Sequence, residues 1–118
     1  MARAVLTFCG LAVVATLAVF PAHAAVPARV QIVEKEYFLT LSRPRVPHGK
    51  VIVQVVNFGM DNHDLVVQSK SGKSWKFDTL SPQDHATKTL TLPAGKYTLF
   101  CSLPGHRKLG MVATLTVA

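Results

Sequence analysis

Residues 92–111 read LPAGKYTLFCSLPGHRKLGM, and they carry the strongest indication of the fold. A Pro-Ala-Gly turn leads into residues 96–101, where side chains alternate between two faces as they do in a half-buried strand. Pro104 and Gly105 then break the strand. The last residue of the strand, Cys101, is therefore expected at one end of a sheet, where loops gather and functional sites are commonly built.

The rest of the chain consists of similar short, β-branched runs separated by turn residues. Besides residues 96–101, strands are expected at residues 29–33, 37–41, 51–56, 63–67, 87–92 and 112–117. Residues 69–81 are polar, and a short helix and an irregular segment are equally consistent with them. About seven or eight short strands without a long amphipathic helix predict an all-β fold, a single antiparallel Greek-key β-sandwich.

The first 24 residues are expected to be a secretory signal peptide that precedes the fold. Arg3 gives a positive start, residues 4–20 are uncharged and mostly apolar, and residues 21–24 end in the small-x-small pattern of a cleavage site. Cleavage after Ala24 would leave one domain at residues 25–118. We expect an exported, periplasmic or otherwise extracytoplasmic protein without membrane insertion after cleavage; a retained anchor is the alternative.

The charge of the chain is basic but spread out. The formal net charge is +7, from 13 Lys and Arg against 6 Asp and Glu. Scattered basic residues are typical of a solvated surface, and docking to an acidic partner is the second interpretation. No aromatic residues interleave with the basic ones, so we expect no nucleic-acid partner.

Cysteine usage points to a metal. Because Cys9 would leave with the signal peptide, the mature chain would hold one cysteine, Cys101, which cannot form an internal disulfide. A buried structural cysteine is the alternative. Cys101 is followed by His106 and Met111 with the spacing C-x4-H-x4-M. Thiolate and thioether favour Cu(I) and imidazole suits both copper oxidation states, whereas zinc sites do not choose methionine.

A second imidazole is needed, and the mature chain offers three. His48 lies in a Pro-His-Gly turn and His85 in a polar stretch, so both are interpreted as surface histidines. His63 begins an extended run after a loop, at a strand–loop boundary like that of Cys101. The predicted ligands of one copper ion are His63, Cys101, His106 and Met111.

Two segments resemble the plastocyanin/azurin family of small blue-copper proteins, the cupredoxins. Residues 55–65, VVNFGMDNHDL, are similar to the segment of the first ligand histidine, and residues 92–111 resemble the hairpin and ligand loop. The gap between cysteine and histidine is similar to that in auracyanin and rusticyanin. The resemblance implies a trigonal plane of His63, Cys101 and His106 with a long axial bond to the methionine of the loop.

The resemblance also implies a function, which is to carry single electrons and not to act as an enzyme. The partners would be redox proteins, such as a cytochrome or a copper enzyme with an acidic docking surface, and we expect a monomer. His106 would lie at the surface as the exit route for electrons. An apolar apron would surround it, formed by Phe58, Met60, Leu103, Pro104 and Leu109.

One position departs from the family pattern. The residue after the first histidine usually ties its strand to the cysteine loop and is commonly asparagine, whereas here it is Asp64. A carboxylate near the sulfur would lower the reduction potential unless it is protonated or paired.

Three other functions remain open. A periplasmic copper carrier or resistance protein could use the same site. An enzyme with Cys101 as nucleophile and His106 as base leaves Met111 without a role. A metal-free binding domain could share the scaffold, because fold does not fix function.

Overall fold

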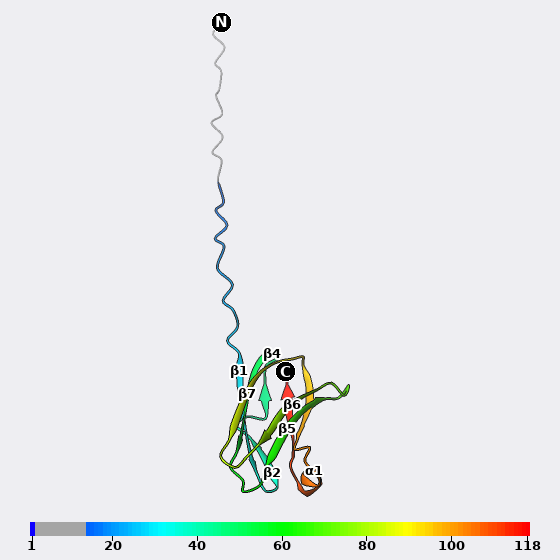
Figure 1. Ribbon diagram of the computed structural model, residues 1–118. Helices are drawn as coiled ribbons and strands as arrows, with labels where there is room; N and C mark the ends of the chain where they lie inside the picture. Colours follow the sequence, from blue (N-terminus) through cyan, green and yellow to red (C-terminus); the bar gives the residue numbers. More distant parts are fainter. Residues whose placement is uncertain (2–13) are drawn as a thin grey trace.

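The computed structural model describes Met1 and residues 14–118. Residues 14–27 form neither helix nor strand and lead away from the folded part (Figure 1). Most of the predicted signal peptide, with Cys9, lies outside the described residues, so cleavage after Ala24 stays a prediction. Within the described ranges, no helix is long and apolar enough to cross a bilayer.

The part of the chain from residue 28 onward folds as two packed sheets (Figure 1). The elements are β1 (Ala28–Lys35), β2 (Phe38–Leu41), β3 (Arg45–Val46), β4 (Gly49–Asn57), β5 (His63–Ser69), β6 (Ser74–Leu80), β7 (His85–Leu92), β8 (Gly95–Phe100), α1 (His106–Leu109) and β9 (Val112–Val117). One sheet has the order β2-β1-β4-β7 and the other β3-β9-β8-β5-β6. The predicted β-sandwich is confirmed, and the seven predicted strands agree with the observed ones within about two residues at each end.

Both sheets are mixed, where a purely antiparallel arrangement was expected. β1 pairs in parallel with β4, and β3 pairs in parallel with β9, while the other pairings are antiparallel. After the β1–β2 hairpin the chain crosses to the second sheet as β3 and returns as β4 beside β1. This crossing makes the parallel pairs, and β3 has only two residues, too few for a sequence pattern.

The segment left open between a short helix and an irregular run is a strand, β6, so both alternatives were wrong. Phe77 is fully buried, while its neighbours Lys76 and Asp78 are exposed. Among the strands that the structure describes, β6 lies at the edge of its sheet and pairs only with β5. Because much of an edge strand faces solvent, its polar residues dilute the alternation that identifies a strand.

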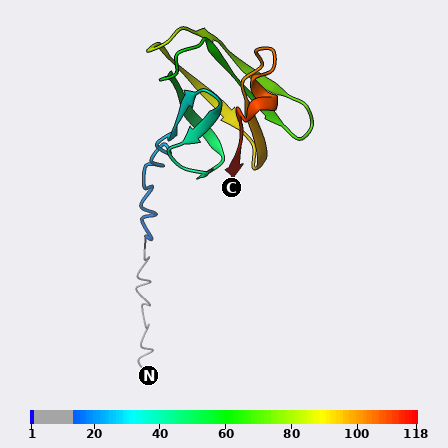
Figure 2. The ribbon, with the colours of Figure 1, turned by 90° about the horizontal axis from the view of Figure 1, so that it is seen from below.

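The pairing of β5 with β8 places the site. The core between the sheets includes Ile32, Val53, Leu65, Phe77 and Leu99, all fully buried. β5 and β8 run antiparallel, with Val66 opposite Phe100. The first residue of β5 and the residue after β8 therefore meet at one end of the sandwich. Figure 2 shows the molecule from that end, where α1 also lies.

Candidate metal centre

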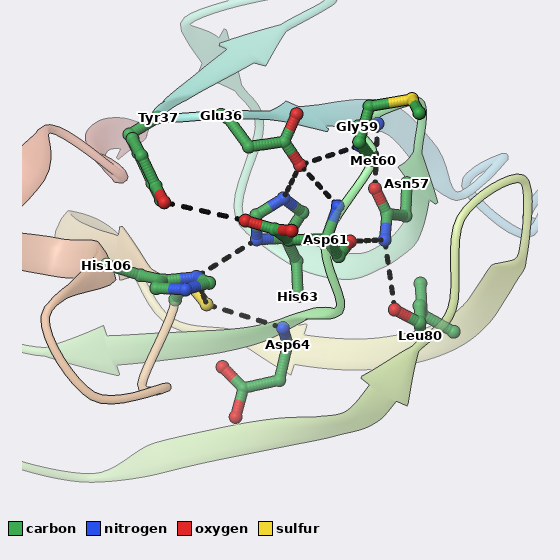
Figure 3. Close-up of polar contacts among 11 residues, drawn as sticks. Glu36, Tyr37, Asn57, Gly59, Met60, Asp61, His63, Asp64, Leu80 and His106 are labelled. Carbon is green, nitrogen blue, oxygen red and sulfur yellow. Dashed lines mark hydrogen bonds and ion pairs between the residues drawn. The ribbon is translucent and has the colours of Figure 1, made fainter.

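Three of the four predicted ligands bring their donor atoms together. The Nδ1 atoms of His63 and His106 are 3.1 Å apart (Figure 3), and Cys101 Sγ is 3.5 Å from His106 Nδ1. All three donors lie within 4.8 Å of one another. A trigonal ion with bonds of about 2.0–2.3 Å needs donors about 3.5–4 Å apart. The donor set fits a soft, imidazole- and thiolate-binding ion such as copper after movements of a few tenths of an ångström.

Local backbone structure holds the ligand loop closed. His63 opens β5, Cys101 directly follows β8, and His106 opens the single turn α1. The turn before α1 requires glycine, because Gly105 has a φ of 79°. Within the loop, Cys101 N donates to Met111 O at 3.2 Å and Met111 N donates to His106 O at 3.1 Å.

These main-chain bonds keep Met111 next to the other three candidates. The methionine side chain is fully buried at this end of the sandwich. A thioether in that place is a weak donor suited to the axial position of a copper site. Cys101 and His63 are also fully buried, whereas His106 is partly exposed, as expected for the residue nearest solvent.

Asp64 ties β5 to the cysteine loop, as the resemblance implied. Its Oδ1 accepts the main-chain N–H of Ser102 at 2.6 Å, and its Oδ2 accepts the Ser102 hydroxyl. Lys76 Nζ lies 3.5 Å from Oδ2. Asp64 N also donates to Cys101 Sγ at 3.4 Å. The carboxylate is therefore paired, so it is not expected to lower the reduction potential.

The Cys101 thiol is placed to keep its proton until a metal ion binds the sulfur. Burial raises the pKa of Cys101 above its ordinary value, and the N–H groups of Asp64 and Leu103 offset this only in part. A thiol of this kind stays protonated in the metal-free protein at neutral pH. Metal binding then releases the proton as the sulfur becomes a ligand.

Glu36 also belongs to the site, although no sequence pattern marks it. Its Oε1 lies 2.8 Å from His63 Nε2 and accepts the main-chain N–H groups of Met60 and Asp61, each at 2.7 Å (Figure 3). These N–H groups, with His63, hold the pKa of Glu36 down at about 2. Metal-bound histidines usually donate their second ring N–H to an acceptor, so an acceptor was predictable, but its identity was not.

The two histidines interpreted as surface residues stay outside this cluster. His48 is exposed, and its Nδ1 lies 2.8 Å from the carbonyl oxygen of Ala118. His85 is exposed at the start of β7. Both interpretations are confirmed.

Comparison with solved structures supports the fold. The structure is similar to dithionite-reduced auracyanin from Roseiflexus castenholzii, with 21% identity and a TM-score of 0.64 over 80% of this chain and 99% of that one. It is similar to auracyanin A, a "blue" copper protein from Chloroflexus aurantiacus, with 17% identity and a TM-score of 0.61 over 79% and 100%. Rusticyanin from Thiobacillus ferrooxidans gives 18% identity and a TM-score of 0.60 over 79% of each chain.

The family follows from the sequence. No curated protein sequence matches the chain. Residues 23–118, however, match the family described as copper binding proteins, plastocyanin/azurin family. With the donor cluster at the sandwich end, this match shows that the cofactor is one copper ion. The chain belongs to the plastocyanin/azurin family of copper-binding proteins, the cupredoxins.

Proposed function

We propose that the protein is an exported type 1 (blue) copper protein that shuttles single electrons between redox partners. The ligands would be His63, Cys101, His106 and Met111. The observation that carries the proposal is the convergence of two imidazole nitrogens and one sulfur, 3.1 and 3.5 Å apart, from two distant segments of chain. Bound copper supplies the one-electron chemistry.

The surroundings of the donors support electron transfer because they fix the site in advance. The β5–β8 pairing, the closed ligand loop and the Asp64–Ser102 hydrogen bonds hold the donors in place without a metal. A site that is rigid in this way changes little between Cu(II) and Cu(I). A small change of geometry on electron transfer keeps the barrier to transfer low.

The surface around His106 supports weak docking of a partner protein. The five predicted apron residues are all at least partly exposed, with Met60 84% and Leu109 60% exposed. Exposed apolar side chains grouped around a site are typical of protein contact surfaces. Arg107 and Lys108 are exposed beside them and would steer an acidic partner, such as a cytochrome or copper enzyme, over a small interface.

Export is part of the proposal and rests on the sequence of residues 1–24. Residues 14–26 are exposed and precede the first strand, so residues 14–24 contribute nothing to the core. The mature protein would then start at Ala25. Mass spectrometry of the protein recovered from the extracytoplasmic fraction checks this, and a mass that includes the apolar run would contradict it.

The decisive experiment is the colour of the copper complex. Purified protein given Cu(II) is expected to turn intensely blue through charge transfer from the Cys101 thiolate, and Cys101→Ser is expected to stay colourless. Reversible oxidation and reduction with a cytochrome should accompany the blue colour. Unfolding curves of both metal-free proteins serve as the control for folding.

A colourless copper complex of the unaltered protein would exclude an electron carrier of this type. Copper transfer to an acceptor protein without redox cycling would instead favour the copper carrier that uses the same residues.

A further inference from the structure

We propose that Glu36 is a positioning residue of the copper centre, which fixes the His63 ring and favours Cu(II) over Cu(I) through its negative charge. The inference rests on the proposed function, since it takes His63 as a copper ligand. It assigns a role to a residue outside the four ligands and outside the segments that resemble the family.

The contact between Glu36 and His63 selects which ring nitrogen faces the metal. An ionised carboxylate only accepts hydrogen bonds, so the hydrogen at 2.8 Å from Oε1 must be carried by His63 Nε2. The lone pair of Nδ1 is then free and points toward His106 (Figure 3). His63 is fully buried, and among the described residues Glu36 is its one polar side-chain partner other than a candidate ligand.

The carboxylate is itself held in place by the main chain of the loop between β4 and β5. Met60 N and Asp61 N both donate to the oxygen that faces His63. The side chain of Asn57 holds the main chain of this loop through two hydrogen bonds. Its Oδ1 accepts a hydrogen bond from Gly59 N at 2.8 Å, and its Nδ2 donates one to Asp61 O at 2.8 Å (Figure 3). With His63 Nε2, three hydrogen-bond donors therefore converge on one carboxylate oxygen, which fixes its position more firmly than a single surface contact would.

Gly59 provides the space for this contact. A Cβ atom at position 59 would lie 2.8 Å from Glu36 Cδ and 2.9 Å from His63 Nε2, and closer still to Glu36 Oε1. Gly59 is not among the glycines with positive φ, so the backbone conformation does not require glycine here. Glycine is needed at this position because the carboxylate and the imidazole occupy the volume of any side chain.

A carboxylate bonded to a metal-bound imidazole makes the imidazole a stronger donor and adds a negative charge near the ion. Both effects stabilise the more highly charged Cu(II). Glu36→Gln keeps the size and one acceptor oxygen but removes the charge. We expect it to lower the ratio of Cu(II) to Cu(I) affinity about tenfold, which raises the reduction potential by about 59 mV for one electron.

Two further variants separate charge from position. Gly59→Ala leaves every charge in place but sets a methyl group against both the carboxylate and the His63 ring, so it should break their contact and weaken Cu(II) binding by about tenfold or more. Asp61→Asn removes one negative charge from the loop between β4 and β5. The Asp61 carboxylate contacts Tyr37 Oη at 3.5 Å and not His63. The effect of Asp61→Asn on the reduction potential should be clearly smaller than that of Glu36→Gln.

The readouts are the reduction potential, the Cu(II) affinity and ¹⁵N NMR of the metal-free protein. In metal-free protein, the His63 Nε2–H should exchange slowly with solvent. This protection should persist in Glu36→Gln and be lost in Glu36→Ala and Gly59→Ala. If Glu36→Gln keeps the protection of the His63 Nε2–H that Glu36→Ala loses, residue 36 positions the His63 ring and does not merely affect folding.

Three results would overturn the inference: equal potentials for Glu36→Gln and the unaltered protein, equal shifts for Asp61→Asn and Glu36→Gln, or a fast-exchanging His63 Nε2–H in the metal-free protein. A blue protein with any of these results keeps the proposed function while Glu36 loses its role. If the unaltered protein is not blue, the NMR measurement still decides whether Glu36 positions His63.

Discussion

Replacing Glu34 by methionine is expected to raise the free energy of unfolding of the metal-free protein at pH 8 by several kcal/mol. Glu34 lies on the inward face of β1 and has no exposed surface. Neither of its carboxylate oxygens has a hydrogen-bond partner in the part of the chain that the structure describes. Burial, and secondly the negative charge of Asp64, raise the pKa of Glu34 to about 8.

The raised pKa makes stability depend on pH in a definite direction. Above its ordinary pKa of 4.5, the unfolded chain loses this proton while the folded protein keeps it up to about pH 8. The free energy of unfolding therefore falls as the pH rises from 4.5 to about 8. At about 1.4 kcal/mol per pH unit, the total loss is on the order of 5 kcal/mol. Methionine carries no proton and fills a similar volume, so the variant should lack this slope.

Urea unfolding of the metal-free proteins at pH 5, 6.5 and 8 (roughly the span between the pKa of Glu34 in the unfolded chain and its pKa in the folded protein) measures the effect. Asp78→Asn, which changes an exposed carboxylate on β6, is the matched control and should leave the slope unchanged. If the free energy of unfolding has the same pH dependence in Glu34→Met and in the unaltered protein, Glu34 is not a buried neutral acid.

The ligand loop and most strands could be predicted because their signals are local. Alternation along residues 96–101 and the spacing from Cys101 to Met111 can be read within a few residues of chain, and both agree with the structure. The donor cluster also needed His63, which lies 38 residues before Cys101; its place at a strand–loop boundary selected it among the three histidines, and the family resemblance supported that choice.

Glu34 and Glu36 could not be predicted, for a physical reason. They are two residues apart, so alternation would place both on the same face of β1, yet one is buried in the sandwich and the other follows the end of the strand and contacts His63. Where the strand ends decides their roles, and strand ends are the least certain part of a sequence pattern. Carboxyl groups are also rarely buried in a protein core, so a sequence pattern does not predict them there. Such exceptions are most common near functional sites.

Replacing Asp64 by alanine is expected to cost about 3 kcal/mol of unfolding free energy in the metal-free protein. Alanine removes the carboxylate that accepts the main-chain N–H and the hydroxyl of Ser102, and each hydrogen bond to a charged group contributes about 1.5–3 kcal/mol. Asp64→Asn keeps an acceptor for Ser102 N, so its cost should be well below that of alanine.

A double-mutant cycle with Ser102→Ala tests whether this loss comes from the tie between β5 and the cysteine loop. If the tie is the cause, Ser102→Ala alone loses the hydroxyl bond, and the double variant loses less than the two single losses added together. Strict additivity would assign the cost of Asp64→Ala to other contacts, such as the one with Lys76. Asp64→Asn gives an independent check: since the Asp64 charge helps to raise the pKa of Glu34, the slope of stability between pH 5 and 8 (about the same span) should become shallower in this variant. The ionisation of Glu34, the charge of Asp64 and the hydrogen bonds that hold the loop of Cys101 would then be energetically coupled.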